Sequence, residues 1–458
     1  MRPFPLALFA AALVIADDWS RFRGPNGSGI AAGAGYPTEF SATKNLAWRT
    51  PVRPGKSSPV VTEKHIFLTG FADEKLYTQC FDRATGKLLW ERSEDRTRRD
   101  AVNLLNHPAA LTPVTDGENV YVLFKEFGLL SYNAAGKLRW KAPISSQKNS
   151  QGLGASPIIA GENVLSLVDQ LQGSYIAAYA KSNGELRWKI AREESEGWST
   201  PILLQPPGQP LQIITAGDSK IGGHLVSNGK RTFTFPGASP AMVATPVIDG
   251  HSIIAFGYGA ATFSPFSAQL EKRDKNKDGK INRDEFTQAD NVLNSIAGFI
   301  GNRDGEVTED KWIEWGKHVG GGTALLSLKL DAPQPTQLWR TEKGFEGVVP
   351  SPILHDGLIY VVRNGGILTA YDAKTGASVK AGRITDALGG YSASPVLANG
   401  LLYFASEEGK LSVVRPGREW EVVQVNDIGD PFFATPALSA GRIYARGDDA
   451  LYCFALSL

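Results

Sequence analysis

The residues best suited to chemistry lie in one stretch of twelve, 274–285 (DKNKDGKINRDE). Side chains with oxygen atoms stand at positions 1, 3, 5, 9 and 12, and a glycine stands at position 6, where a tight loop must turn. Ca²⁺ prefers six to eight oxygen ligands, drawn from carboxylates, amide oxygens and backbone carbonyls. The spacing therefore predicts one calcium ion, held by Asp274, Asn276, Asp278, the backbone carbonyl of Lys280, Asn282 and Glu285.

This stretch matches the calcium-binding loop of an EF-hand position by position. Phe266 and Leu270 precede it at helical spacing, and Phe286 begins the apolar face of a helix that would leave it. The alternative interpretation is a solvated, turn-rich charged loop. Because basic residues offset much of the negative charge, we expect a dissociation constant of roughly 10⁻⁴–10⁻³ M and a bracing role rather than a signalling one.

A second hand is indicated by residues 302–308 (NRDGEVT). When its glycine is aligned with position 6, Ile300 falls at position 1 and Lys311 at position 12, and neither supplies a carboxylate. We therefore expect a partner hand that binds no calcium, in which Val307 pairs with Ile281. The residues expected to pack beneath this pair are Trp312 and Trp315.

The rest of the chain repeats a unit that opens with Ser-Pro or Thr-Pro. The openings carry Pro59, Pro113, Pro157, Pro201, Pro246, Pro352, Pro395 and Pro436. Most are 41–45 residues apart, and short runs of β-branched and aromatic residues alternate with glycine-containing turns inside each unit. Such a period with four strands per unit is typical of a β-propeller. We expect an all-β fold, an eight-bladed β-propeller of four-stranded antiparallel blades.

A tryptophan recurs at one place in the unit, as in FDRATGKLLW, NAAGKLRW and KSNGELRW. We expect these tryptophans to fill the space between adjacent sheets, because aromatic side chains bury large areas. An exposed row that stacks on a ligand is the alternative. The last unit lacks a fourth strand, and residues 46–52 are expected to supply it and so close the ring.

Two spacings between openings are long, at 54 and 106 residues. The first reflects an insertion around residues 94–110. The second places residues 261–319, which hold the calcium loop, between strands two and three of blade five as a small helical EF-hand insertion. The expected segments are 1–16 (signal peptide), 17–57 (N-terminal segment with the closing strand), 58–260 (blades one to four and the first part of blade five), 261–319 (EF-hand insert) and 320–458 (the rest of blade five to blade eight).

The first residues are typical of an export signal. Arg2 precedes the apolar stretch 4–16, which is too short to span a membrane, and small residues precede a cut before Asp17. We expect an exported protein, periplasmic or extracellular, without a transmembrane segment and monomeric. A net charge of +1 argues against a nucleic-acid partner. Cys80 and Cys453 are expected to be small buried residues, although export would permit a disulfide between them.

The runs AYDAKTG and FDRATGKLLW and the Ser/Thr-Pro openings resemble the PQQ-type repeat of quinoprotein-like β-propellers. FRGPNGSG and EGWSTP look like exported PQQ-binding-like propeller proteins of bacteria. The resemblance implies either of two functions. Quinoprotein alcohol dehydrogenases hold PQQ over the axis with Ca²⁺, a catalytic aspartate and a disulfide between adjacent cysteines. Noncatalytic propellers are exemplified by an outer-membrane assembly lipoprotein. This chain has no Cys-Cys pair and no CxxCH haem motif.

Other candidates for a site are scattered. His107, Asp169 and Gln170 could face a central funnel or be solvated loop residues, and residues 196–198 could lie near the axis or serve packing. Catalytic and PQQ-binding residues are not assigned. We interpret the chain as an exported, noncatalytic binding or scaffold module that binds calcium, with a protein or small-molecule ligand at a propeller face. The alternative is a periplasmic PQQ-dependent oxidoreductase of the alcohol or sugar dehydrogenase type.

Overall fold

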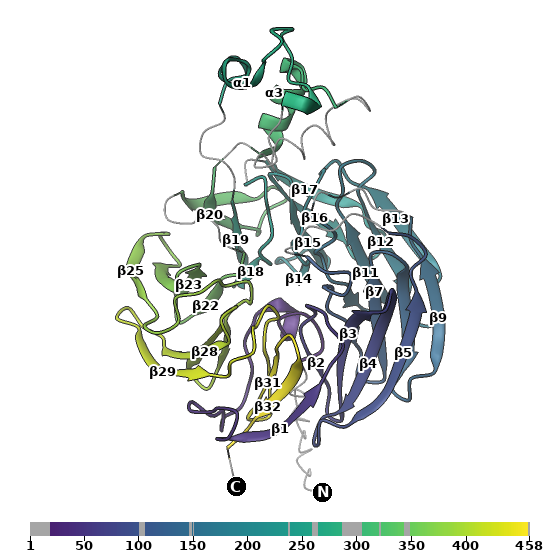
Figure 1. Ribbon diagram of the computed structural model, residues 1–458, viewed down its shortest axis with the longest axis vertical. Helices are drawn as coiled ribbons and strands as arrows, with labels where there is room; N and C mark the ends of the chain where they lie inside the picture. Colours follow the sequence, from purple (N-terminus) through teal and green to yellow (C-terminus); the bar gives the residue numbers. More distant parts are fainter. Residues whose placement is uncertain are drawn as a thin grey trace, which may run out of the picture.

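The computed structural model describes residues 19–99, 106–145, 149, 151–236, 239–258, 264–285, 305–319, 322–342 and 349–456. Their strands form eight sheets of four strands each, which stand around a common centre as the blades of a propeller (Figure 1). The predicted all-β, eight-bladed fold is confirmed. The predicted signal peptide, 1–16, lies outside the described residues. No helix within the described ranges is long and apolar enough to cross a membrane.

Blades one to four take their strands consecutively from the chain. Blade one has β2 (Val60–Val61), β3 (His65–Ala72), β4 (Lys75–Asp82) and β5 (Leu88–Asp95). Blade two has β6 (Val114–Thr115), β7 (Asn119–Phe124), β8 (Gly128–Asn133) and β9 (Leu138–Pro143). Blade three has β10 (Ile158–Ala160), β11 (Asn163–Val168), β12 (Tyr175–Ala180) and β13 (Leu186–Ala191). Blade four has β14 (Ile202–Leu204), β15 (Gln212–Gly217), β16 (Lys220–Leu225) and β17 (Arg231–Pro236).

Blades five to seven follow the same order. Blade five has β18 (Val247–Asp249), β19 (Ser252–Gly257), β20 (Ala324–Lys329) and β21 (Thr336–Thr341). Blade six has β22 (Ile353–His355), β23 (Leu358–Arg363), β24 (Ile367–Asp372) and β25 (Ser378–Arg383). Blade seven has β26 (Val396–Ala398), β27 (Leu401–Ala405), β28 (Lys410–Arg415) and β29 (Glu421–Asp427).

Blade eight combines both ends of the described chain. Its inner three strands are β30 (Ala437–Ser439), β31 (Arg442–Arg446) and β32 (Ala450–Phe454), and its outer strand is β1 (Leu46–Pro51), which pairs antiparallel with β32. The predicted closure of the ring by the N-terminal strand is therefore confirmed. Both cysteines are free and fully buried, Cys80 in β4 and Cys453 in β32. Burial raises the pKa of the Cys453 thiol to about 11.

The recurring tryptophans fill the space between blades, as predicted. Each lies in the fourth strand of one blade and packs on the glycine of the turn between strands three and four of the next. A Cβ atom on Gly136 would lie 2.6 Å from the Trp90 ring, and one on Gly184 would lie 2.5 Å from the Trp140 ring. The Trp140 indole also donates a hydrogen bond of 2.9 Å to a backbone carbonyl of blade three. Glycine is therefore required in these turns by contact as well as by its positive φ.

The hydroxyl groups of the Ser/Thr-Pro openings connect neighbouring blades. In seven of eight steps around the ring, the backbone N–H of one opening Ser or Thr donates to the hydroxyl of the next, over 2.9–3.1 Å. The last step joins Thr435 of blade eight to Ser58 of blade one and completes the circuit. The exception is the step from Thr200 to Thr245, whose buried hydroxyl has no partner among the described residues.

An N-terminal segment, residues 19–31, lies at the centre of the ring, where it is drawn in purple in Figure 1. It contains the short 3₁₀ helix η1 (Pro25–Gly27). Trp19 is buried and bridges to the first strand of blade one, Asn26 bonds both backbone groups of Leu203 in blade four, and Ile30 bridges to blade seven. Since the first strands are the innermost, this segment fills the centre of the propeller between them.

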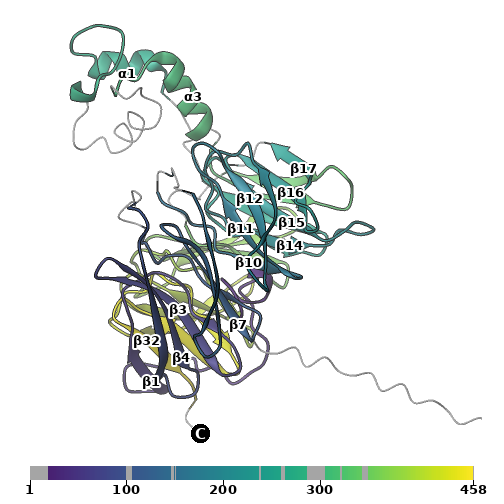
Figure 2. The ribbon, with the colours of Figure 1, turned by 90° about the vertical axis from the view of Figure 1, so that its right-hand side faces the viewer.

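The long insertion falls between β19 and β20, the second and third strands of blade five. It contains α1 (Phe266–Arg273), the 3₁₀ helix η2 (Arg283–Glu285) and α3 (Glu309–Val319). Figure 2 shows α1 and α3 beyond the end of the blades. Phe266 and Trp312 bring the two helices together, with ring centroids 6.3 Å apart. The location of a helical insertion in blade five is thus as the sequence indicated.

Candidate functional site

The two long insertions lie at the same end of the ring. Because neighbouring strands within each blade are antiparallel, the connections between blades and the turns between strands two and three share one face. We call this the opening face, since every Ser/Thr-Pro opening begins there. The helical insert lies between strands two and three of blade five, and the other long insertion lies in the connection from blade one to blade two. The opening face therefore has the most elaborate loops.

One position recurs at the centre of the opening face. The residue two places before each opening Ser or Thr is at least partly exposed in all eight blades, whereas the residue between them is buried every time. We call these eight the mouth residues, because they flank the innermost strands where those strands begin. The mouth residues are Lys56, Ala110, Gly154, Trp198, Val243, Val349, Ser392 and Phe433.

Neighbouring mouth residues touch across blade boundaries. The ammonium group of Lys56 lies 4.2 Å from the centroid of the Phe433 ring, a cation–π contact between blades one and eight. A Cβ atom on Gly154 would lie 2.7 Å from the Trp198 side chain of the next blade. The two aromatic mouth residues belong to blades four and eight, on opposite sides of the ring. The mouth is consequently a mainly apolar ring with two aromatic groups and one cation.

Burial perturbs the charged groups beside the mouth. It lowers the pKa of Lys56, while Asp448 and Glu407 oppose that shift. Burial, helped by Arg446 and Lys56, lowers the pKa of His107 to about 4. His107 is therefore neutral at pH 7, and its Nδ1 accepts a hydrogen bond of 3.2 Å from the N–H of Ala109, next to a mouth residue. The structure therefore places His107 beside the mouth. Of the two interpretations of the sequence, this agrees with the one in which His107 lies near the central funnel.

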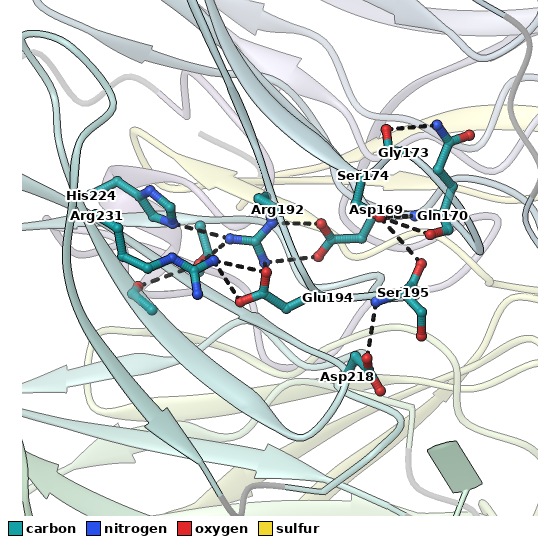
Figure 3. A network of polar contacts seen from close by, with 12 residues as sticks. Asp169, Gln170, Gly173, Ser174, Arg192, Glu194, Ser195, Asp218, His224 and Arg231 are labelled. Carbon is teal, nitrogen blue, oxygen red and sulfur yellow. Dashed lines mark hydrogen bonds and ion pairs between the residues drawn. The ribbon is translucent and has the colours of Figure 1, made fainter. Parts of the chain in front are cut away.

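Asp169, in contrast, belongs to a buried ion network between blades three and four (Figure 3). Its carboxylate forms a bidentate pair with Arg192, at 2.7 and 3.1 Å, and Nη2 of Arg231 donates to both carboxylate oxygens of Glu194, at 2.8 Å each. Arg192 also meets Nε2 of His224 at 3.1 Å. The Asp169 side chain is fully buried, so the expectation of a solvated loop residue was wrong. The network connects two blades, because Arg192 follows β13 of blade three and also meets His224 of blade four.

Gln170 is buried beside Asp169 and is not a solvated loop residue either. Its side-chain amide donates to the carbonyl of Gly173 over 3.0 Å, and its backbone N–H donates to the hydroxyl of Ser174 over 2.9 Å. These bonds hold the turn between strands two and three of blade three. Gln170 therefore supports the turn that carries Asp169.

The network is electrically balanced. Although burial alone would lower the pKa of Arg192, its pairs with Asp169 and Glu194 raise it. Burial alone would raise the pKa of Glu194, yet Arg192 and Arg231 lower it. Two carboxylates therefore compensate two guanidinium groups in the interior. Close packing also explains Gly197, because a Cβ atom there would lie 2.8 Å from the Asp169 carboxylate.

The predicted calcium ligands lie in one compact loop between α1 and η2. Asp274 accepts hydrogen bonds from the N–H groups of Asp278 and Gly279, at 3.2 and 2.9 Å. Asp278 accepts from the side-chain amides of Asn276 and Asn282, at 3.0 and 2.9 Å. Gly279 has φ +81°, the left-handed turn expected at position 6. These four polar side chains are therefore grouped within the loop.

Glu285 spans the loop from its far end. One carboxylate oxygen accepts from the N–H groups of Lys275 and Asn276, and the other accepts from that of Asn282. The side chain of Lys280 points to Glu306, at 2.9 Å, leaving its backbone as the group the prediction requires. No group of three or more His, Cys, Asp and Glu side chains within the described ranges, this loop included, is arranged as a metal site.

The predicted pairing of Ile281 with Val307 is present. Ile281 and Val307 form an antiparallel bridge, with N–H to carbonyl distances of 3.1 and 2.9 Å, and both side chains are fully buried. Trp312 is buried and donates from its indole to Ser264. Phe286, Ile300 and the side chain of Trp315 lie outside the described residues.

Comparison with known protein families shows to which family the chain belongs. The sequence matches the family described as outer membrane protein assembly factor BamB over residues 30–203 and 318–382, more than half of the chain. The chain belongs to the BamB family. The stretch between the two matched segments contains most of blade four, the first two strands of blade five and most of the helical insert.

Solved structures agree with the BamB family fold. BamB from Moraxella catarrhalis is 12% identical, with a TM-score of 0.56, over 90% of this chain and 98% of that one. A europium-containing methanol dehydrogenase is 11% identical, with a TM-score of 0.58, over 96% and 98%. The computationally designed protein Ika8 is 10% identical, with a TM-score of 0.55, over 89% and 98%. At such identities the likeness shows the fold alone. No curated protein matches the sequence.

Sequence reasoning missed the mouth of this BamB-family propeller. Its eight residues share no residue type, so no composition or spacing of like residues marks them. The available signal was positional, since each stands two residues before a Ser/Thr-Pro opening. A Ser-Pro or Thr-Pro pair predicts where a first strand begins, but it does not reveal the role of the residues before it.

Proposed function

We propose that the chain is an exported, noncatalytic module that binds a partner protein at the mouth of its opening face. The observation that carries this proposal is the ring of partly exposed mouth residues, two of them aromatic, set on a rigid scaffold of buried neighbours. Membership of the BamB family supports a protein partner over a small molecule.

The composition of the mouth suits a protein partner. Aromatic residues are enriched among those that dominate interface energies, and here they are surrounded by aliphatic and small residues that exclude water. Trp198 is held by a hydrogen bond of 2.8 Å from its indole to Gly152, so little entropy is lost when a partner packs on it. Lys56, held over the Phe433 ring, would pair with a carboxylate at the edge of the partner.

A photo-crosslinking experiment tests this assignment. A benzoylphenylalanine placed at Phe433 should give a discrete adduct with an envelope protein in living cells, and a Lys56→Glu substitution should weaken it. The matched control is the same probe at Leu186, which is 50% exposed on an outer strand. Equal adducts at both positions, or none at Phe433, would refute binding at the mouth.

We further propose that the loop 274–285 binds one calcium ion and braces the insert. The ligands would be Asp274, Asn276, Asp278, the carbonyl of Lys280, Asn282 and Glu285. The buried Ile281–Val307 bridge supports this, since it is how paired EF-hands join their loops. When calcium binds, the carboxylates that now accept hydrogen bonds from backbone N–H groups would lose those bonds and bind the ion instead.

Calorimetry separates calcium binding from a merely charged loop. The double variant Asp274→Ala/Glu285→Gln should abolish the calcium heat. Asp284→Asn is the matched control, because Asp284 is exposed and stands at position 11, which supplies no ligand. Equal calcium binding by all three proteins would reject the assignment.

A PQQ-dependent oxidoreductase is the second candidate, favoured by one observation at the mouth. Trp198 could stack on a planar quinone, and Lys56 could pair with one of its carboxylates. The metal that accompanies PQQ needs several carboxylate ligands, and the described residues do not gather three His, Cys, Asp or Glu side chains for it. The fit is therefore incomplete. Dye reduction with alcohols and sugars, after addition of PQQ and calcium, would overturn the noncatalytic proposal.

A further inference from the structure

The residue two places after each opening proline lies in the first, innermost strand of its blade. We call these eight the edge residues, and they are Val61, Thr115, Ile159, Leu203, Ile248, Leu354, Leu397 and Leu438. In blade seven the N–H of Leu397 donates to the carbonyl of Gly29, and its carbonyl accepts from the N–H of Ala31, each over 2.8 Å. The side chain of Asn26 bonds both backbone groups of Leu203. The backbone of these edge residues therefore points toward the axis, where the N-terminal segment lies.

Two consecutive residues of the N-terminal segment bridge neighbouring blades. Trp19 exchanges two backbone hydrogen bonds of 2.9 Å with Val61 of blade one. The next residue, Ser20, accepts a bond of 2.9 Å from the N–H of Thr115 in blade two. Successive residues of an extended chain point their backbone groups to opposite sides, so two of them suffice to join two edges. The protein thus contains one example of a peptide held between the edge residues of adjacent blades.

The edge residues of blades five and six lack such a partner. Ile248 pairs with Ile253, and Leu354 pairs with Ile359, in the register that blade seven also has. Their N–H and C=O groups therefore point toward the axis as well. No hydrogen bond from a described residue reaches these groups on that side. Two donors and two acceptors on adjacent blades are thus left without partners within the described part of the chain.

A cavity of about 210 Å³ lies between these two edges and the N-terminal segment. Its walls are Asn26, Ser28, Ile30, Pro246, Val247, Ile248 and Leu354. None of these walls carries a charge, and most are apolar. An apolar cavity of about 150 Å³ already binds benzene, so this one can admit an aliphatic side chain. The cavity therefore suits an uncharged occupant that is apolar and also offers N–H and C=O groups.

We propose that this cavity binds an extended segment of a partner polypeptide that carries an aliphatic side chain. One residue of the segment would bond to Ile248 and the next to Leu354, as Trp19 and Ser20 bond to blades one and two. In such strand addition the main-chain hydrogen bonds give affinity, and the pocket selects the side chain. A fatty acyl chain would fill the cavity but leave the backbone groups unpartnered. The site is separate from the mouth, because no mouth residue lines it.

Fluorescence polarisation with a capped, labelled peptide tests the proposal on the full-length protein. The probe is Ser-Gly-Ile-Ala-Ala, copied from residues 28–32, which already pair with Leu397 in this way. It should bind, and N-methyl groups on its isoleucine and on the alanine that follows should weaken binding by about tenfold for each bond lost. Dodecanoic acid is the probe for an acyl chain. Because these measurements use the wild-type protein, they do not depend on the folding of any variant.

Proline substitutions locate the binding site. Ile248→Pro removes the N–H that points toward the axis, and proline is tolerated at a sheet edge where the N–H is outside the ladder. The peptide should bind about tenfold more weakly, whereas Ile248→Ala, which keeps the N–H, should bind it nearly as the wild type does. The matched control is Ile159→Pro, at the same place in blade three but outside the cavity, which should leave binding unchanged.

Circular dichroism verifies that each variant is folded, and Leu354→Pro repeats the test on the other wall if Ile248→Pro is not. The proposal is overturned if the wild-type protein does not bind the peptide or binds dodecanoic acid instead. It is equally overturned if the N-methylated peptide binds as tightly as its parent, or if the folded proline variants at positions 248 and 159 bind alike.

Discussion

The contact between tryptophan and glycine at each blade boundary allows a quantitative prediction for Gly184→Ala. This glycine has φ +75°, and a Cβ atom would lie 2.5 Å from Cε3 of Trp140. The left-handed backbone costs alanine about 1–2 kcal/mol. Forcing a methyl group into the packed ring costs about 1–3 kcal/mol more. We therefore expect a loss of about 2–5 kcal/mol in the free energy of unfolding.

Gly161→Ala is the matched control in the same blade. Gly161 also has a positive φ, +57°, but no other atom lies within 4 Å of the position that an added Cβ would take. Only the backbone term applies, so the expected loss is about 1–2 kcal/mol. The difference between the two variants isolates the contact with the tryptophan.

Urea unfolding followed by tryptophan fluorescence and circular dichroism measures both losses. In a Trp140→Leu background the contact term should vanish, so the penalties of the two glycine variants should converge. Equal losses in the wild-type background, or a difference that persists in the Trp140→Leu background, would refute the reasoning.

Further predictions concern closure, the buried network and pH. Deleting residues 45–52 should convert soluble protein to aggregate, measured by size-exclusion chromatography, because β32 would become an exposed edge; a soluble folded product would contradict ring closure. Asp169→Ala should cost about 3–5 kcal/mol in urea unfolding, since it leaves Arg192 buried and partly unpaired; a loss below about 1 kcal/mol would show that the pair is replaceable. Burial lowers the pKa of His224 to about 4, so the stability due to its neutral form is present above about pH 6.5 and is lost as pH falls toward 4. His224→Gln should flatten that part of the stability profile, and an unchanged profile would count against it.

The repeat made most of the fold predictable. The spacing between the Ser/Thr-Pro openings predicts the number of blades, and the fourth strand missing from the last unit predicts a closing strand from residues 46–52. Each of these depends on residues that recur because every blade must pack in the same way. The pairing of Ile281 with Val307 was predictable for a related reason, since both residues follow the glycine of a similar loop by two positions.

The interior polar groups could not be predicted in this way. Asp169 and Arg192 are 23 residues apart in the chain, and Arg231 belongs to the next blade, so no local pattern connects them. Arg21 and Arg23 stand in a turn-rich stretch whose composition is typical of a surface loop. Contacts with distant blades, such as the bridge from Trp19 to blade one and that from Ile30 to blade seven, show that the segment lies inside the ring.

The central position of the N-terminal segment has a consequence for how the chain folds. Arg23 bonds to a residue 329 positions away, and Phe40 bonds to one 386 positions away. These two bonds of the N-terminal part can therefore form only after blades six and seven exist. Proteins dominated by such distant contacts fold slowly, and an incomplete ring leaves strand edges open in the meantime. Assembly of this propeller should be limited by the final joining of its two ends, which makes that step the one most dependent on protection from aggregation.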